Sequence, residues 1–239
     1  MNIGGLEKFS LIDYPGKICA VVFLSGCNFR CGFCHNPQLV DPKLIKEQPV
    51  MGEKEALDFL KTRKGKLDGV CITGGEPTVW KDLEKFILKI KSLGLLVKLD
   101  TNGTDPKLVE KLLRSGLIDY FAIDIKNSPA KYKKTVGAGV KVGDIEKTLK
   151  LIARHNIPLE LRTTVVSNLH ILEDIEGIKK WLLSLGIADK ICLYAIQQFR
   201  PGNNLKEEFN SIAAYEEKEL QKMADILRTI IKKVEVRGV

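Results

Sequence analysis

The sequence has few aromatic residues, few cysteines and no long hydrophobic run. Only 7% of its 239 residues are Phe, Trp or Tyr, which leaves little material for a platform on which nucleic-acid bases could stack. The longest apolar run near the start, residues 18–24, is far too short to cross a bilayer. Residues 1–17 lack the order of charged, apolar and small residues that marks a signal peptide. We therefore expect a folded, cytoplasmic protein without a membrane partner.

The charge of the chain is moderately basic. It has 38 Lys and Arg residues against 30 Asp and Glu residues, a formal net charge of +8. A basic surface can attract nucleic acid or an acidic protein. The lysines are spread over many predicted helices, which is typical of solvated helix faces rather than of one binding stripe. We therefore favour an acidic protein partner over nucleic acid.

The six cysteines are unevenly spaced. In a reducing cytoplasm they are not expected to form disulfides, which favours metal binding or catalysis. Three of them fall within eight residues, whereas the other three stand alone in apolar runs, where a thiol usually behaves as a small buried hydrophobic group. We predict that the solitary cysteines, Cys19, Cys71 and Cys192, belong to the core.

Strand and helix patterns alternate along the chain. Apolar, β-branched runs predict strands over 18–24, 70–73, 95–100, 120–125, 159–166 and 191–196. Apolar residues three and four apart predict helices over 54–64, 83–93, 107–115, 145–155, 171–185 and 216–232. Such alternation predicts an α/β fold with a parallel sheet, either open and doubly wound or closed into a full or partial barrel.

The length fits one α/β barrel, which takes about 200 to 250 residues. We predict a single domain over residues 1–239, with a barrel core at 17–199 and only a loop and one helix at 200–239. Residues 37–52 and 197–211 are predicted to be the longest loops. The chain then has no room for an appended substrate domain, and its solitary cysteines make no second cluster motif.

Polar clusters follow five of the predicted strands. In parallel α/β folds the carboxyl ends of the strands form the ligand-binding face, so these clusters should converge on one mouth. Each cluster alone could be an ordinary turn, but their convergence favours a site. The clusters lie at 25–37, 74–77, 100–103, 124–126 and 162–164.

Cys27, Cys31 and Cys34 have the spacing Cys-x3-Cys-x2-Cys, which can present three thiolates to one metal centre. A structural zinc site usually needs four protein ligands, and the nearby His35 directly follows Cys34 and is poorly placed to share its metal. A four-iron cluster held by three cysteines would keep one iron open for a non-protein ligand. The spacing favours an iron–sulfur cluster and leaves zinc as the alternative.

The three-cysteine motif, with Phe33 before its last cysteine, and the following Gly74-Gly75-Glu76-Pro77 resemble the radical S-adenosylmethionine (radical SAM) superfamily. This resemblance implies a partial (β/α)6 TIM-like barrel that holds a [4Fe-4S] cluster. It also implies that the open iron binds S-adenosylmethionine, and that one electron cleaves the cofactor to methionine and a 5′-deoxyadenosyl radical. The cluster and the cofactor would then carry the chemistry.

The segments 10–16 and 34–37 narrow the resemblance to activating enzymes for glycyl-radical enzymes. The sequence is most similar to activating proteins of anaerobic ribonucleoside-triphosphate reductase, and the likeness covers nearly the whole chain. It implies an oxidoreductase of class EC 1.97.1.- that abstracts a glycine Cα hydrogen from a partner enzyme. Some activators have a histidine near residues 197–198, where this chain has Gln197 and Gln198.

The resemblance also implies which residues bind the cofactor. Carboxylate and carbonyl oxygens suit its ammonium group, and amine, guanidinium and amide donors suit its carboxylate and ribose. The predicted cofactor-binding residues are Asn36, Gly74, Gly75, Glu76, Pro77, Thr101, Asn102, Asp124, Lys126 and Arg162.

Three further predictions concern titratable residues. Asp100 and Asp124 should repel each other at neighbouring strand ends, so one hypothesis is that a monovalent cation such as sodium or potassium binds between them. The alternative is that these carboxylates act as caps or form an ion pair with Lys126. Asp13 either faces the partner or forms a turn before Pro15. His155 and His170 are predicted to be surface or loop residues.

Two partners and two alternative functions complete the prediction. The resemblance implies a glycyl-radical enzyme as protein substrate and an acidic flavodoxin or ferredoxin as electron donor, whose encounter a positive rim would speed. One alternative is a radical SAM enzyme that modifies a nucleic acid or a small molecule. The other is a non-catalytic zinc or electron-transfer module.

Overall fold

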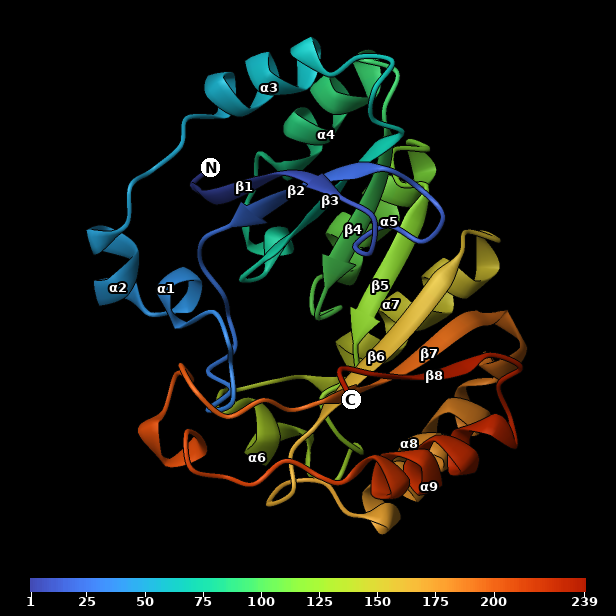
Figure 1. Cartoon of the computed structure of the whole chain (residues 1–239). Helices are drawn as coiled ribbons and strands as arrows, with labels where there is room; N and C mark the ends of the chain where they lie inside the picture. Colours follow the sequence, from blue (N-terminus) through green and yellow to red (C-terminus); the bar gives the residue numbers. More distant parts are fainter.

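The computed structural model describes residues 1–239 and has one curved sheet of eight strands, ordered β1 to β8 as in the sequence (Figure 1). β1 runs antiparallel to β2, and every later neighbour is parallel. β1 and β8 do not pair with each other, so the barrel is open on that side. The strands are β1 (Ile3–Ser10), β2 (Cys19–Leu24), β3 (Gly69–Gly74), β4 (Leu96–Thr101), β5 (Tyr120–Asp124), β6 (Leu159–Val165), β7 (Ile191–Gln198) and β8 (Val234–Arg237).

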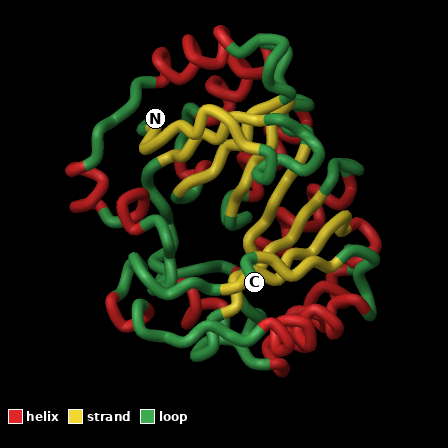
Figure 2. Tube along the Cα trace, viewed as in Figure 1, coloured by secondary structure: helices red, strands yellow, loops and turns green.

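Helices cover the outer face of the sheet (Figure 2). In α5, for example, the buried residues Val109, Leu112 and Leu113 lie three and four positions apart, and Asp105 caps its start by accepting a hydrogen bond from the Leu108 N–H at 3.0 Å. The main helices are α3 (Glu53–Thr62), α4 (Leu83–Ser92), α5 (Pro106–Arg114), α7 (Val142–Arg154), α8 (Leu172–Leu185) and α9 (Glu217–Arg228). None of the helices is both long enough and apolar enough to span a membrane.

The apolar core has two parts. A large cluster of 53 buried residues fills the space between the sheet and the helices. A small one on the inner face of the barrel consists of Tyr14, Cys19, Val21, Cys71 and Tyr120. Toward the carboxyl ends of the strands the inner face carries polar and charged residues instead, which places the site at that end.

The structure confirms the partial barrel, and the six predicted strands are β2 to β7. The prediction that only a loop and one helix follow β7 is wrong, because β8 follows α9. The predicted loop over residues 37–52 contains two short helices, α1 (Pro37–Val40) and α2 (Pro42–Glu47). β1 and the short helix α6 (Tyr132–Val136) were not predicted.

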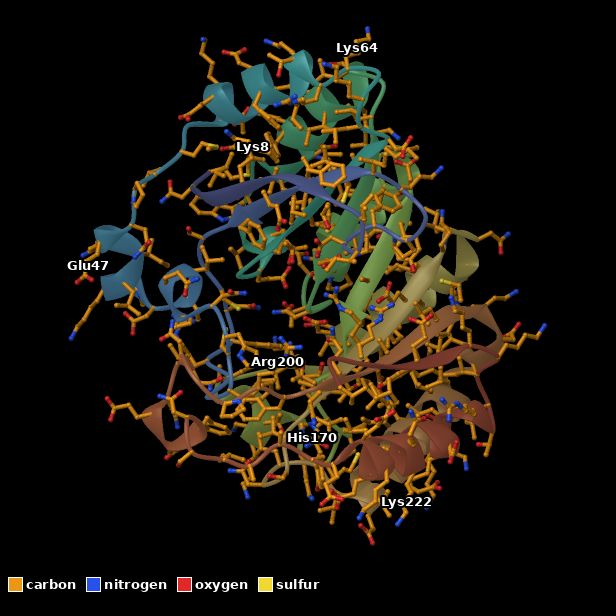
Figure 3. The ribbon with its side chains drawn as sticks, viewed as in Figure 1. Lys8, Glu47, Lys64, His170, Arg200 and Lys222 are labelled. Carbon is orange, nitrogen blue, oxygen red and sulfur yellow. The ribbon has the colours of Figure 1, made fainter.

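The solitary cysteines differ in burial. Cys19 and Cys71 are fully buried, as predicted, whereas Cys192 is exposed at the start of β7 and is not a core residue. The basic side chains fit the prediction of solvated faces: Figure 3 shows Lys64 and Lys222 at opposite ends of the molecule, pointing away from it.

Candidate functional site

The carboxyl ends of β2 to β6, with the loops after β2 to β5, line one cavity, to which β6 contributes Thr164; we call it the central cavity. It brings together most of the predicted site residues, together with the three clustered cysteines. The predicted residues on its wall are Cys27, Cys31, Cys34, Asn36, Gly74, Gly75, Glu76, Asp100, Thr101, Asn102, Asp124 and Lys126. Pro77, Arg162 and Asp13 are not on this wall.

The three cysteines lie on the loop between β2 and α1. Cys31 is buried, and Cys27 and Cys34 are half-buried. Burial raises the pKa of Cys27 to about 12 and that of Cys31 to about 11, although the charge of Lys126 lowers both. The loop is held by its backbone, because Gly26 N–H donates to Leu39 O at 2.7 Å and Arg30 N–H donates to Val136 O at 2.9 Å.

The thiol spacing bears on the choice between zinc and an iron–sulfur cluster. Thiolates on one zinc ion are about 3.8 Å apart, since each sits about 2.3 Å from the metal in tetrahedral geometry. No three Cys, His, Asp or Glu side chains of this chain converge closely enough to hold a single ion. A four-iron cluster takes one thiolate per iron and needs a wider arrangement on one wall. Three thiols on one wall are the donor set of a four-iron cluster with one iron left open, whereas a structural zinc site needs a fourth protein ligand.

A segment that the sequence analysis predicted as a loop fastens the cysteine loop. This C-terminal strap, residues 199–215, lies beside the loop after β2 (Figure 1) and pairs with it, since Leu205 N–H donates to Cys34 O at 3.1 Å and Lys206 N–H donates to Gly32 O at 3.0 Å. A Cβ on Gly32 would lie 2.2 Å from the Phe209 ring, so only glycine fits beneath the strap. No local pattern in the sequence indicated this pairing.

Glu76 is 1% exposed and uses its carboxylate to join two loops. Its Oε1 accepts hydrogen bonds from the Thr78 N–H and hydroxyl at 3.0 and 2.5 Å and from the Thr101 hydroxyl at 2.5 Å, and its Oε2 accepts from the Asn102 N–H at 2.6 Å. Burial raises the pKa of Glu76, and these bonds oppose that shift. These four hydrogen bonds fix the loops after β3 and β4, and Oε2, which accepts only one of them, keeps a lone pair free.

Asn28, which the sequence analysis did not single out, connects the cysteine loop to the loop after β4. Its Oδ1 accepts from Asn102 Nδ2 at 2.8 Å, and its Nδ2 donates to the Thr104 hydroxyl at 2.8 Å. The cysteine loop is thus tied to the same backbone that Glu76 holds.

Arg162 lies between the two predicted acidic residues. Its Nη1 donates to Asp100 Oδ2 at 2.7 Å and its Nε donates to Asp124 Oδ1 at 2.9 Å. Lys98 pairs with the other oxygen of Asp100, and Lys126 Nζ donates to Asp124 Oδ2 at 3.1 Å. Burial alone would raise the pKa of both carboxyl groups, but Arg162 and the lysines outweigh it and lower both. The predicted ion pair with Lys126 is present, and Arg162 bridges the two carboxylates.

His170 lies in the loop between β6 and α8, as predicted, but it is fully buried rather than on the surface. Its Nδ1 accepts from the Val166 N–H at 3.1 Å, which leaves Nε2–H to donate to Lys126 O at 2.7 Å. Figure 3 shows His170 in the half of the molecule that carries α8 and α9. His170 therefore fixes the backbone at Lys126, a residue of the central cavity.

We expect acid to destabilise the protein partly through His170. Burial lowers the pKa of this imidazole, although its hydrogen bonds oppose the shift. Since the folded state disfavours the protonated form, the free energy of unfolding should fall as pH drops below the unfolded-state pKa of about 6.5, by at most about 1.4 kcal/mol per pH unit. Urea denaturation at pH 7.5 and 5.5 measures this loss.

The matched variants are His170→Asn and His155→Asn, because His155 is exposed. The loss between the two pH values should shrink in His170→Asn and stay at the wild-type size in His155→Asn. An equal loss in all three proteins would show that His170 does not cause it.

Asp13 and the two glutamines lie outside the central cavity. The Ser10 hydroxyl donates to Asp13 Oδ2 at 2.5 Å, so the predicted turn is present. Asp13, Arg162 and Gln197 line a second cavity, described below, whereas Gln198 donates to Tyr215 O at 2.5 Å. Pro77 is buried at the start of a short 3-10 helix, Pro77–Val79.

Comparison with known proteins adds an independent observation. Residues 21–182 match the model of the radical SAM superfamily. A protein of Methanocaldococcus jannaschii whose name assigns it to the glycyl-radical enzyme activating enzymes is 38% identical over 247 residues, covering 99% of this chain and 96% of that protein. A pyruvate formate-lyase-activating enzyme of Clostridium pasteurianum is 30% identical over 185 residues, covering 75% of this chain and 74% of that protein.

The same fold is present in a solved structure. Streptococcus suis SuiB, bound to S-adenosylmethionine, is similar with a TM-score of 0.67 at 16% identity, covering 91% of this chain and 52% of SuiB. At this identity the likeness concerns the fold alone.

Proposed function

Because the chain belongs to the radical SAM superfamily and, within it, to the glycyl-radical enzyme activating enzymes, we propose that it generates a glycyl radical in a partner protein. The observation that carries this proposal is the loop of three thiols on the wall of the central cavity, in a chain that matches an activating enzyme over nearly its full length. When bound, the cluster and S-adenosylmethionine supply the chemistry: one electron breaks a sulfonium C–S bond, and the resulting 5′-deoxyadenosyl radical takes a hydrogen atom from glycine Cα.

In this proposal Cys27, Cys31 and Cys34 each ligate one iron of a [4Fe-4S] cluster, and the fourth iron is left for the cofactor. The C-terminal strap and Asn28 hold the loop that carries these thiols. The half-buried position of Cys27 and Cys34 limits the access of water to the ligands.

The walls of the central cavity hold the cofactor. The peptide groups of Gly74 and Gly75 offer acceptors for its ammonium, and Glu76 fixes the loops after β3 and β4 through the Thr78 and Asn102 N–H groups. Lys126 uses one of its three N–H donors on Asp124, which leaves donors for the cofactor carboxylate. Asn36, Thr101 and Asn102 supply further polar contacts on the same wall.

Two predicted cofactor-binding residues receive a positioning role instead. Arg162 orients Asp124, and through it Lys126, by the ion pairs described above. Pro77 begins the turn that carries Thr78, a donor to Glu76. For Asp100 and Asp124 we favour the ion-pair network over a bound monovalent cation.

We further propose that the partner is an anaerobic ribonucleoside-triphosphate reductase, that the reaction belongs to class EC 1.97.1.-, and that the whole chain acts as one domain in the cytoplasm. The resemblance of the motifs supports the partner. The net charge of +8 supports an acidic flavodoxin or ferredoxin as electron donor. Arg200, an exposed residue at the start of the strap just after β7 (Figure 3), adds positive charge near the cysteine loop.

Electron paramagnetic resonance tests this proposal. The reconstituted protein is incubated without oxygen with S-adenosylmethionine, a reductant and the glycyl-radical protein encoded with it, and a glycyl doublet is expected in the partner. Replacement of the target glycine by alanine should remove the doublet. Cleavage of S-adenosylmethionine without a glycyl signal in any co-encoded partner would favour the alternative, a radical enzyme acting on a nucleic acid or a small molecule.

A further inference from the structure

The turn between β1 and β2 exposes two adjacent aliphatic side chains. Leu11 is 62% exposed and Ile12 is 86% exposed, the largest exposure among the exposed large apolar residues of the chain. Full burial of such a side chain is worth about 1.5 to 3 kcal/mol, so two of them in water offer substantial binding energy to a partner. We call these two residues the apolar knob.

The apolar knob sits on a turn with a fixed conformation. The Ser10 hydroxyl oxygen accepts hydrogen bonds from the Ile12 and Asp13 N–H groups, both at 3.2 Å. After the turn Tyr14 is 4% exposed and packs on Tyr120, with ring centroids 5.8 Å apart. Because the turn is already ordered, little conformational entropy is lost when a partner binds to it, which favours affinity.

The knob lies at the edge of a second cavity, of about 500 Å³, which we call the side cavity. Ile12 and Asp13 line it from the turn after β1, and Arg237 lines it from β8. β1 and β8 are the two edge strands of the sheet and do not pair with each other, so the side cavity lies at the open side of the barrel.

The side cavity shares a wall with the central cavity. Arg162 lines the side cavity, while its ion-pair partners Asp100 and Asp124 line the central cavity. Its lining is otherwise polar, with Lys98, Glu160 and Gln197. A polar cavity with Ile12 at its rim fits a polypeptide segment whose amides contact the polar lining while an apolar patch of the same protein covers the apolar knob.

We propose that Leu11 and Ile12 are the docking contact for the protein that carries the target glycine, and that this protein binds at the open side of the barrel, over the side cavity. This inference rests on the proposed function, since it names how that protein is bound. A second copy of this chain is a poorer occupant, because a stable dimer buries about 1,200 to 2,000 Å² in total and the other exposed aliphatic residues, such as Leu88 and Leu183, lie on separate helices. In protein interfaces a few buried side chains carry most of the binding energy, so Leu11 and Ile12 can act as the hot spot of a larger interface that is otherwise polar.

The test compares the double variant Leu11→Ser/Ile12→Ser with the control Leu88→Ser, which changes a 49% exposed leucine on α4. The probe is the co-encoded glycyl-radical protein, and the rate of glycyl-radical formation is measured against its concentration. The apparent KM for this protein should rise at least about tenfold in the double variant, because each hot-spot truncation costs more than about 1 kcal/mol, while kcat stays unchanged. Leu88→Ser should match the wild type in both constants.

Other measurements separate the possible failures. Cleavage of S-adenosylmethionine without the protein substrate, together with the thermal unfolding midpoint, checks that the double variant is folded and loaded. An unchanged KM, or a fall in kcat at constant KM, would overturn the docking role while leaving the proposed function intact. The docking role would also be overturned if the wild type ran as a dimer and the double variant ran as a monomer in size-exclusion chromatography. If the wild type forms no glycyl radical at all, the proposed function fails and the docking role falls with it.

Discussion

Replacement of Cys31 by alanine is expected to remove the iron–sulfur cluster and with it all cleavage of S-adenosylmethionine. The loop supplies only three thiols, so the loss of one leaves two ligands for a cluster that already has an open iron. No other cysteine can replace it, because Cys19 and Cys71 are fully buried on the inner face of the barrel and Cys192 lies at the start of β7.

The measurements are iron and sulfide content after anaerobic reconstitution, and production of 5′-deoxyadenosine after reduction. Iron should fall from about four per chain to less than one, and cleavage should fall to background. The matched control is Cys192→Ala, which removes an exposed thiol whose only polar contact is with the Tyr120 hydroxyl at 3.7 Å. Cys192→Ala should keep the cluster. A full cluster in Cys31→Ala would show that the three cysteines are not its ligands.

Periodicity predicted the elements of the fold that repeat. The strands β2 to β7 have short apolar runs because both faces are covered near their amino ends, and helices such as α5 have a single apolar face. β1 breaks this pattern, because it contains Gly4 and Gly5 and its pairing with β2 is irregular. β8 has only four residues, of which only Val234 is buried, so it gives no apolar run.

The residues of the site could be predicted from their place after the strands, but their roles could not. Sequence order shows that Asp100 and Asp124 lie at the ends of two strands and that Arg162 lies within a third, whereas their pairing depends on the register that sets Asp124 opposite Arg162. Likewise, the sequence predicts Glu76 as a cofactor contact, but it does not show the four hydrogen bonds by which Glu76 joins the loops after β3 and β4.

Long-range contacts explain what the sequence analysis missed. His170 stands in a polar loop pattern, and only its bond to Lys126 O, 44 residues away, makes it part of the interior. The contact of Phe209 with Gly32 likewise joins segments far apart in the chain. Local patterns carry no information on such pairs, since the partner is chosen by the packing of loops rather than by periodicity.

Replacement of Arg162 by methionine is expected to be the most destabilising polar substitution in the barrel. The guanidinium bridges two carboxylates, and its side chain is 15% exposed. Removing one partner of a buried ion pair costs about 3 to 5 kcal/mol, and we expect about 3 kcal/mol because Asp124 is 30% exposed. For a chain of this size that corresponds to a fall in Tm of about 6 to 12 °C.

The pH dependence identifies the cause of that loss. Arg162 and the neighbouring lysines hold the pKa values of Asp100 and Asp124 below their usual range, so their contribution to stability is present above the unfolded pKa of about 3.9 and is lost as pH falls through the lower folded values. The difference in unfolding free energy between wild type and Arg162→Met should therefore be largest near neutral pH and should narrow below about pH 4. Arg228→Met is the matched control, because Arg228 pairs with Asp225 on the surface of α9 and should cost less than about 1 kcal/mol. A difference that stays constant with pH would mean that Arg162 stabilises the barrel through packing rather than charge.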